Sequence, residues 1–269
     1  MDVSDSAPND GSSTPLVFLH GWLDSRHTWD LVLPHHISSH HRIISVTFRG
    51  WGDASHDGTY SIDAYATDVI GLLESLSLSV PAVLVGHSMG TLVATAVAAR
   101  APDRVAGLIL VGAAATMRPE HVLDPSDSTT CADIATLCHG WVTDQLDHLI
   151  PFVKDGSTPQ KIADQIMVET LKADTKAYGE CWQSMRDENH TAELADITTN
   201  VLIVWGSKDG IFVEEDQVAL EAALSKADVW RVTVDGASHG VLWTHAPKVA
   251  AAMVDFLSAV TDRIDPKYP

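Results

Sequence analysis

Three residues whose side chains can together perform nucleophilic catalysis lie at positions where strands are expected to end. Ser88 is the centre of the turn GHSMG (86–90), which follows an apolar run at 80–85 and precedes a helical pattern rich in Ala, Val and Leu. A G-x-S-x-G turn between strand and helix holds its serine in a strained bend that exposes the hydroxyl. The free N–H groups of the following helix favour negative charge beside it. We therefore predict that Ser88 is a nucleophile.

A nucleophilic serine needs a base, and the base needs an acid that orients it. Asp209 comes just after the strand pattern NVLIVWG, and His239 comes just after the next pattern, VWRVTV. Because the carboxyl ends of parallel strands open at one edge of a sheet, we expect both side chains to converge on Ser88. The other acids considered for the orienting role are Glu214, Glu215, Asp216 and Asp235. The first three are explained more simply as the exposed first turn of the next helix.

The elements that must position these residues form an alternating pattern. Helical patterns, such as those at 62–78 and 246–260, separate short runs that are apolar throughout. Such runs are typical of parallel strands covered on both faces, so we predict an α/β fold with a mostly parallel sheet flanked by helices. The predicted strands are 15–20, 42–48, 81–87, 105–112, 200–206 and 229–234.

Residues 113–196 interrupt the alternation, because they show amphipathic helical patterns and no buried strand. An insertion of this length between two strands usually shapes a ligand crevice, and we predict a helical cap, or lid; a second helical layer is the alternative. Large apolar side chains of this segment, together with one residue after His239, are expected to line an apolar substrate pocket. They are Met117, Trp141, Trp182, Met185 and Trp243, and core packing is the alternative for each.

Composition narrows the class of partner. Lys and Arg number 17 against 36 Asp and Glu, and the net charge of -19 disfavours nucleic acid, anionic membrane surfaces and polyanionic substrates. Residues 1–14 are polar and acidic and are expected to be a disordered tail, without a signal peptide or membrane span. The cysteines, Cys131, Cys138 and Cys181, lack C-x-x-C spacing, which favours free thiols and a cytoplasmic location. A homodimer is left open.

The sequence resembles the α/β-hydrolase superfamily over residues 15–112 and 197–260. The resemblance rests on HGW at 20–22, RGWGDAS at 49–55, the GHSMG turn, Asp209 and His239. It implies a hydrolase core at 15–112 and 197–269 with a cap at 113–196, nucleophile Ser88, acid Asp209 and base His239. It also implies an oxyanion hole made by the backbone N–H groups of Trp22 and Met89.

Two features depart from the superfamily pattern. Members often begin with two antiparallel strands ahead of the HG strand, whereas only the polar tail precedes it here, so the sheet is expected to be short at that edge. The serine often found two residues after the second glycine of the RGWG turn is Ala54, with Ser55 one step later. His20 and His87 flank the expected site and are interpreted as supports of its turns.

These features predict a serine hydrolase that needs no cofactor or metal and cleaves a neutral, mostly apolar ester or lactone through an acyl-enzyme. A cofactor-free perhydrolase and a C–C bond hydrolase are alternatives within the same chemistry. A ligand receptor built on the hydrolase fold is the alternative of another class, because a fold alone does not define function. The histidines at 35, 36, 40 and 41 are interpreted as a solvated helix end, since no carboxylate or cysteine completes a metal site.

Overall fold

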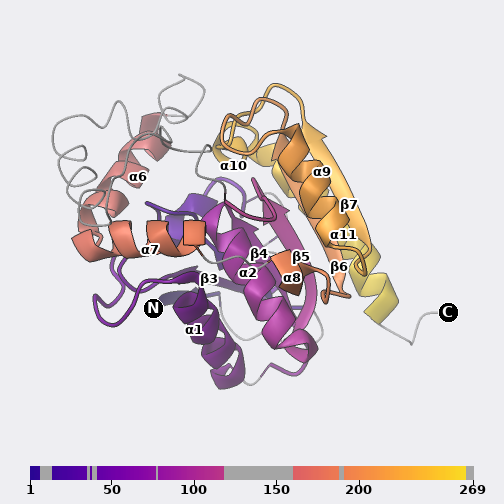
Figure 1. Cartoon of the computed structure of the whole chain (residues 1–269), viewed down its shortest axis with the longest axis horizontal. Coiled ribbons are helices and arrows are strands. Elements are labelled where there is room, and N and C mark those ends of the chain that lie inside the picture. The colour runs from indigo at the N-terminus through magenta and orange to yellow at the C-terminus, as the bar shows by residue number, and fades with distance from the viewer. Residues whose placement is uncertain are drawn as a thin grey trace.

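The computed structural model describes residues 1–6, 14–34, 37, 41–76, 78–117, 160–187 and 191–264 of the 269-residue chain. Within them the chain forms a seven-stranded sheet of order β1-β3-β2-β4-β5-β6-β7 (Figure 1). All neighbouring strands are parallel except β1, which is antiparallel to β3. The predicted mostly parallel sheet is therefore confirmed. The strands are β1 (Asp2–Asp5), β2 (Leu16–Leu19), β3 (Ile43–Thr47), β4 (Ala82–His87), β5 (Val105–Val111), β6 (Asn200–Gly206) and β7 (Val229–Val234).

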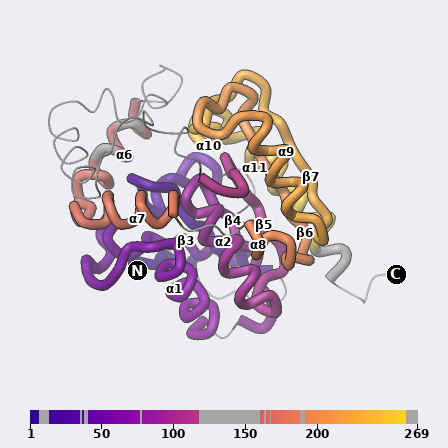
Figure 2. Tube along the Cα trace, viewed as in Figure 1, coloured from indigo at the N-terminus to yellow at the C-terminus, as the bar shows by residue number. Residues whose placement is uncertain are grey.

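Helices cover both faces of this sheet, as Figure 2 shows along the chain trace. One buried cluster joins strand side chains to α1, α2 and α9, and a second joins the opposite side chains to η1, α10 and α11. The described helices are α1 (Ile62–Ser75), α2 (Met89–Arg100), α6 (Gln160–Lys172), α7 (Thr175–Asp187), α8 (Thr191–Leu194), α9 (Glu214–Ala223), α10 (Val241–Thr244) and α11 (Ala246–Ile264). Two 3-10 turns, η1 (Arg26–Trp29) and η2 (Pro102–Arg104), complete them.

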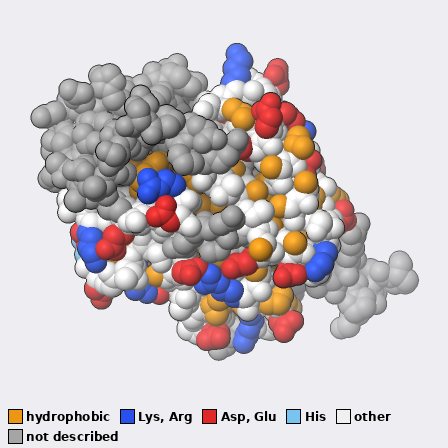
Figure 3. All heavy atoms as spheres, in the orientation of Figure 1, with side chains coloured by type: hydrophobic (Ala, Val, Ile, Leu, Met, Phe, Trp, Pro, Cys, Tyr) orange, Lys and Arg blue, Asp and Glu red, His pale blue; other side chains and the backbone are white. Residues whose placement is uncertain are grey.

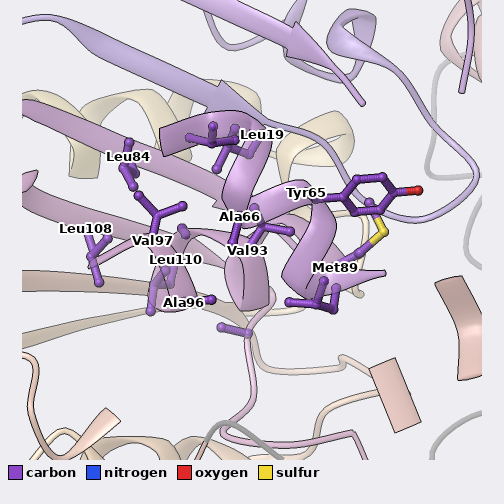
Figure 4. Close-up of a cluster of buried hydrophobic side chains, with 14 of the residues drawn as sticks. Leu19, Tyr65, Ala66, Leu84, Met89, Val93, Ala96, Val97, Leu108 and Leu110 are labelled. Carbon is purple, nitrogen blue, oxygen red and sulfur yellow. The ribbon is translucent and has the colours of Figure 1, made fainter. Parts of the chain in front are cut away.

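The core under α2 fixes the start of that helix against the sheet. Figure 4 shows leucines of β2, β4 and β5 meeting small and branched side chains of α1 and α2, including Ala66, Val93 and Val97. Small residues allow α2 to approach the strands closely. Because this packing is tight, the residues at the start of α2 have little room to move. The turn between β4 and α2 is therefore held on both sides.

The first residues of the chain differ from the expectation. Residues 2–5 form an edge strand on β3, with Asp2 opposite Thr47 and Asp5 opposite Ile44, and not a disordered tail. Two ion pairs neutralise the acids of this strand: Arg26 Nε lies 3.0 Å from Asp2, and an Arg42 guanidinium nitrogen lies 2.6 Å from Asp5. Backbone pairing at the edge needs no apolar face, which explains why polarity misled the prediction. Residues 7–13 lie outside the described part.

The described part of the insertion is attached to the core by α7 and by the end of α6 with the residues that follow it. Ser184 Oγ accepts the backbone N–H of Ile62 at 2.8 Å, and the Tyr60 hydroxyl donates to Asp174 at 2.6 Å. Lys172, at the end of α6, pairs with Asp53 at 2.9 Å. These bonds join the insertion to the loop between β3 and α1. Residues 118–159, which include Trp141, Cys131 and Cys138, lie outside the described part of the chain.

The surface reflects the excess of acids in the sequence. On the face drawn in Figure 3, acidic side chains are interspersed with Lys and Arg, and hydrophobic side chains are scattered among them. Among the described residues, no helix has both the length and the apolar character that crossing a membrane would require.

Candidate active site

Ser88 occupies the sharp corner between β4 and α2. Its φ of +48° and ψ of -117° lie in a region that non-glycine residues rarely adopt, and such a backbone costs about 1 to 3 kcal/mol. The corner is held by the bond from the Ser88 N–H to the Val111 carbonyl (3.0 Å) and by the Thr91 hydroxyl, which donates to the Ser88 carbonyl (2.6 Å). The sheet and the helix thus both fix the serine in this strained conformation.

The two glycines of the turn are required by close backbone approaches. A Cβ added to Gly86 would collide with the carbonyl of Gly90, and one added to Gly90 would collide with the carbonyl of Leu19. Backbone atoms of packed elements cannot move aside as a flexible side chain can. The G-x-S-x-G pattern is therefore what allows β2, β4 and α2 to meet at Ser88.

We expect Gly90→Ala to lower the free energy of unfolding by about 1 to 3 kcal/mol or more, because the added methyl overpacks this contact. Gly71→Ala is the matched control, since a Cβ at Gly71 meets nothing within 4 Å and lies inside α1. That change should stabilise the protein by roughly 0.5 to 1 kcal/mol. Urea unfolding monitored by circular dichroism measures both, and equal effects of the two changes would contradict the packing explanation.

His239 and Asp209 form a buried pair at the carboxyl edge of the sheet. His239 Nδ1 lies 2.8 Å from Asp209 Oδ2, and the two residues are 3% and 5% exposed. The other carboxylate oxygen, Oδ1, accepts the backbone N–H groups of Ile211 (2.8 Å) and Phe212 (3.0 Å). An ionised Asp209 fixes the imidazole proton on Nδ1, which leaves Nε2 as an acceptor.

Burial opposes the ionisation of Asp209, but its surroundings outweigh that effect. The nearby imidazole of His239 and the two backbone N–H donors stabilise the carboxylate, so its pKa is lowered below the ordinary value. The rings of Phe212 and His87 pack on His239, with centroids 5.4 and 5.3 Å away. The pair is thus held in one orientation, with a charged acid beside the histidine.

The competing acids have other partners. Asp235 is exposed and accepts the Ser207 hydroxyl at 3.1 Å, and Glu214 pairs with Arg231 at 2.8 Å. Asp216 was expected on the surface with Glu214 and Glu215, but it is 5% exposed. Its carboxylate accepts the Val213 N–H at 2.9 Å, because it caps the start of α9.

The loop after β2 brings Trp22 close to Ser88. A Cβ on Gly21 would lie 3.3 Å from the Ser88 Cβ, which shows how near the backbone of this loop passes to the serine. His20 Nε2 accepts the Phe48 N–H at 3.0 Å, and its Nδ1 lies 2.7 Å from the Gly21 carbonyl. His20 therefore connects the loop to the end of β3. Met89, the first residue of α2, follows Ser88 directly.

Burial lowers the pKa of His20 to about 4, and burial together with His239 lowers that of His87 to about 3. Below pH 6.5 the unfolded chain binds protons at both histidines and the folded chain does not. The free energy of unfolding therefore decreases as the pH is lowered. Asp24 acts in the opposite direction, because burial raises its pKa to about 7 and the folded state then binds the extra proton.

We expect the free energy of unfolding to fall by about 1.4 kcal/mol for each pH unit that the pH is lowered between pH 6 and pH 4.5. In this range the unfolded chain binds two more protons than the folded chain at the histidines and one fewer at Asp24, a net difference of one proton. Asp24→Asn removes the opposing group and should roughly double this slope. Urea unfolding at several pH values measures the slopes. A wild-type stability that is level or rises toward pH 4.5 would contradict neutral, buried histidines.

A hollow opens beside Ser88. Some of the residues predicted to line a substrate pocket lie along it, and others do not. Met117 and Met185 lie along it. Trp182 instead packs on Trp22, with ring centroids 5.3 Å apart. Trp243 lies in the cluster on the other face of the sheet, where Nε1 donates to Thr28 at 3.2 Å. The hollow is lined by Ser88, Met89, Thr91, Leu92, Ala114, Thr116, Met117, Met185 and Phe212.

Several of these wall residues were missed from sequence although a signal existed. Thr91 and Leu92 follow Ser88 by three and four positions, which is one turn of helix. Phe212 follows Asp209 by three positions and donates its backbone N–H to that acid. Position next to a predicted catalytic residue was therefore a better guide than the apolar character of distant residues.

Within the described residues, no group of three or more His, Cys, Asp or Glu side chains could hold a metal ion. His41 Nδ1 lies 2.9 Å from the Thr14 carbonyl, whereas His35, His36 and His40 lie outside the described part. Cys181 is buried and forms no disulfide among the described residues.

The strained serine corner, the parallel sheet and the buried histidine and acid at its edge define an α/β-hydrolase. A model of the Alpha/beta hydrolase family matches residues 16–252, and the chain belongs to that family. It is thus an enzyme of the hydrolase fold, as the sequence motifs predicted.

Known relatives cover nearly the whole chain. It is 29% identical over 265 residues to a non-heme chloroperoxidase from Streptomyces lividans, with 95% of each chain covered. It is 26% identical over 253 residues to a pimeloyl-[acyl-carrier protein] methyl ester esterase from Neisseria meningitidis, covering 91% of this chain and 77% of that one. The structure of the enol-lactonase from Burkholderia xenovorans superposes with a TM-score of 0.79 at 21% identity, covering 96% of both chains. That last likeness shows the fold alone.

Proposed function

We propose that this protein is a serine hydrolase that cleaves uncharged, mostly apolar esters or lactones through an acyl-enzyme on Ser88. The observation that supports it most is the buried pair of His239 and Asp209, 2.8 Å apart, at the sheet edge where the strained Ser88 corner lies. A base oriented by an acid and a serine held in a high-energy backbone are what nucleophilic catalysis needs.

In the proposed reaction, His239 Nε2 takes the proton of the Ser88 hydroxyl as its oxygen attacks the carbonyl carbon. The backbone N–H groups of Trp22 and Met89 stabilise the oxyanion that forms, and Met89 sits at a helix start where such donors are free. The imidazolium then gives its proton to the departing alkoxide. Water, deprotonated by the same histidine, cleaves the acyl-enzyme and restores Ser88.

The hollow beside Ser88 supports an apolar substrate. Its wall includes the side chains of Leu92, Met117, Met185 and Phe212, and thioethers adapt to irregular apolar shapes. The net charge of -19 disfavours anionic esters. In this proposal residues 113–196 form a cap, whose α7 contributes Met185 to the wall. One relative is named as a methyl ester esterase, and a methyl ester is a bond of this class.

Turnover of p-nitrophenyl butyrate tests the class of function. We expect steady release of p-nitrophenolate over many enzyme equivalents, with kcat of roughly 1 to 10³ per second as for ordinary enzymes. Uncatalysed hydrolysis in the same buffer is the control. A burst of about one equivalent followed by no further release would contradict an esterase and favour a ligand receptor on this fold.

A cofactor-free perhydrolase is the second candidate, favoured by the relative named as a non-heme chloroperoxidase. Hydrogen peroxide would then replace water in the attack on the acyl-enzyme and release a peracid. The thioethers of Met89, Met117 and Met185 around Ser88 argue against it, because methionine is readily oxidised. Peracid formation from an ester and peroxide, faster than carboxylic acid formation at equal nucleophile concentration, would favour the perhydrolase.

A further inference from the structure

Two tryptophan side chains in contact with each other carry hydrogen-bond donors that no described residue accepts. Trp22, in the loop after β2, and Trp182, on α7, have ring centroids 5.3 Å apart at an interplanar angle of 41°. The Nε1 atoms of both rings are buried, and neither has a hydrogen-bond partner within the part of the chain that the structure describes. An indole nitrogen can only donate, so each lacks an acceptor, and a buried donor without one costs free energy.

Three other tryptophans, Trp51, Trp205 and Trp243, do have an acceptor for the indole nitrogen. Trp51 donates to the Tyr65 hydroxyl at 2.9 Å, and Trp205 donates to the Phe212 carbonyl at 2.8 Å. Trp29 Nε1 also has no partner in the described ranges of the chain, but this residue lies in the cluster on the other face of the sheet. Trp22 and Trp182 are therefore unusual in presenting two unpaired donors on rings that touch.

The chain segments that carry the two indoles pass close to the turn that holds Ser88. The residue before Trp22 passes close enough to Ser88 that an added Cβ on Gly21 would be 3.3 Å from the serine Cβ. The residue before Trp182 is also close, since the Cys181 thiol donates to the Met89 sulfur at 3.1 Å. Met185, one helical turn after Trp182, lines the hollow that contains Ser88.

We propose that Trp22 and Trp182 form a polar subsite that binds an uncharged oxygen acceptor, an ether or carbonyl oxygen, on the acyl chain of the substrate. The inference rests on the proposed ester hydrolysis and narrows its substrate class. Two neutral N–H donors suit a neutral acceptor, and the net charge of -19 disfavours a carboxylate. The acyl chain is the part that remains on Ser88 after the alcohol leaves, so a subsite beside Ser88 can bind it in both half-reactions.

Isosteric esters test this directly, because an ether oxygen replaces a methylene with little change of shape. The pairs are p-nitrophenyl methoxyacetate with butanoate, 3-methoxypropanoate with pentanoate, and 4-methoxybutanoate with hexanoate. The ratio of kcat/KM, ether over hydrocarbon, is measured for wild type, Trp22→Phe and Trp182→Phe, and divided by the same ratio for alkaline hydrolysis. Phenylalanine keeps an aromatic ring and removes the donor. Trp29→Phe is the control, since it removes an unpaired indole donor remote from the pair.

For at least one pair the corrected ratio should exceed one in wild type and fall about three- to tenfold in Trp22→Phe and Trp182→Phe, the size of one hydrogen bond. Trp29→Phe should leave it unchanged. Corrected ratios at or below one for every pair in wild type would overturn the subsite even if the variants did not fold. The subsite would also be overturned if Trp22→Phe and Trp182→Phe both folded and both kept the wild-type ratios. If wild type hydrolyses none of the esters, the proposed function fails as well, which distinguishes the two failures.

Discussion

Ser88→Ala is expected to lower kcat for p-nitrophenyl butyrate by on the order of 10⁶, the loss known for removing the nucleophile of a serine protease. The reason is that alanine offers no oxygen to attack the ester, while the His239 and Asp209 pair, 2.8 Å apart, remains. Stability should not fall, because alanine adopts the strained backbone of this corner no less readily than serine. Stopped assays at high enzyme concentration measure the residual rate.

The control is Ser238→Ala, which removes a buried hydroxyl next to His239 that has no hydrogen-bond partner among the described residues. We expect it to change kcat by less than about tenfold, since it touches the packing around the histidine and not the attacking atom. A Ser88→Ala enzyme that retains more than a hundredth of wild-type kcat would show that another group attacks the ester.

Asp209→Asn is expected to lower kcat by about 10⁴, as the same change does in a protease triad. The structure gives a specific reason. The N–H groups of Ile211 and Phe212 both donate to Oδ1, so the asparagine oxygen will occupy that place and its NH₂ will face His239. The imidazole must then accept at Nδ1 and carry its proton on Nε2, where it cannot take the proton of Ser88.

Asp235→Asn is the matched control, because Asp235 follows the neighbouring strand but is exposed and bonded to Ser207. Its kcat should stay within about threefold of wild type, as is usual for surface changes. Steady-state kinetics on one ester compares the two variants. If Asp235→Asn caused the larger loss, the orienting acid would have been assigned to the wrong strand end.

The central strands β2 to β6 could be predicted because they are buried on both faces and are therefore largely apolar. The run at 81–87, for example, appears as β4 at Ala82–His87, with every residue buried. Parallel order then brings the ends of β4 and of the later strands to one edge, so the ends of the runs also located Ser88, Asp209 and His239. Asp209 and His239 are 30 residues apart in sequence and still form the 2.8 Å pair.

The features that could not be predicted depend on contacts distant in sequence. The edge strand at Asp2–Asp5 has an acidic sequence, and its pairing is accompanied by Arg26 and Arg42, which only the folded chain brings near. On α1, Ile62 and Tyr65 are buried, whereas Ile70 is only half-buried. Helical spacing predicts which side of a helix is apolar, whereas the neighbouring elements determine which residues at the border of that side are buried.

The same limit applies to the substrate pocket. Helical spacing placed Trp243 one turn after His239, yet α10 turns this side chain toward Thr28 and away from the hollow. Trp182 packs against Trp22, a contact between residues more than 100 positions apart in the sequence. Apolar composition predicted that large side chains would gather here, but not which of them face the serine.

The central claim is that Ser88 is the nucleophile, and covalent labelling tests it most directly. The native protein is treated with a fluorophosphonate probe, digested, and analysed by mass spectrometry. We predict a single phosphonate adduct on Ser88, in the peptide that contains GHSMG, with loss of esterase activity in proportion to labelling and no adduct on Ser88→Ala. An adduct on another residue, or full activity after complete labelling of Ser88, would contradict the account.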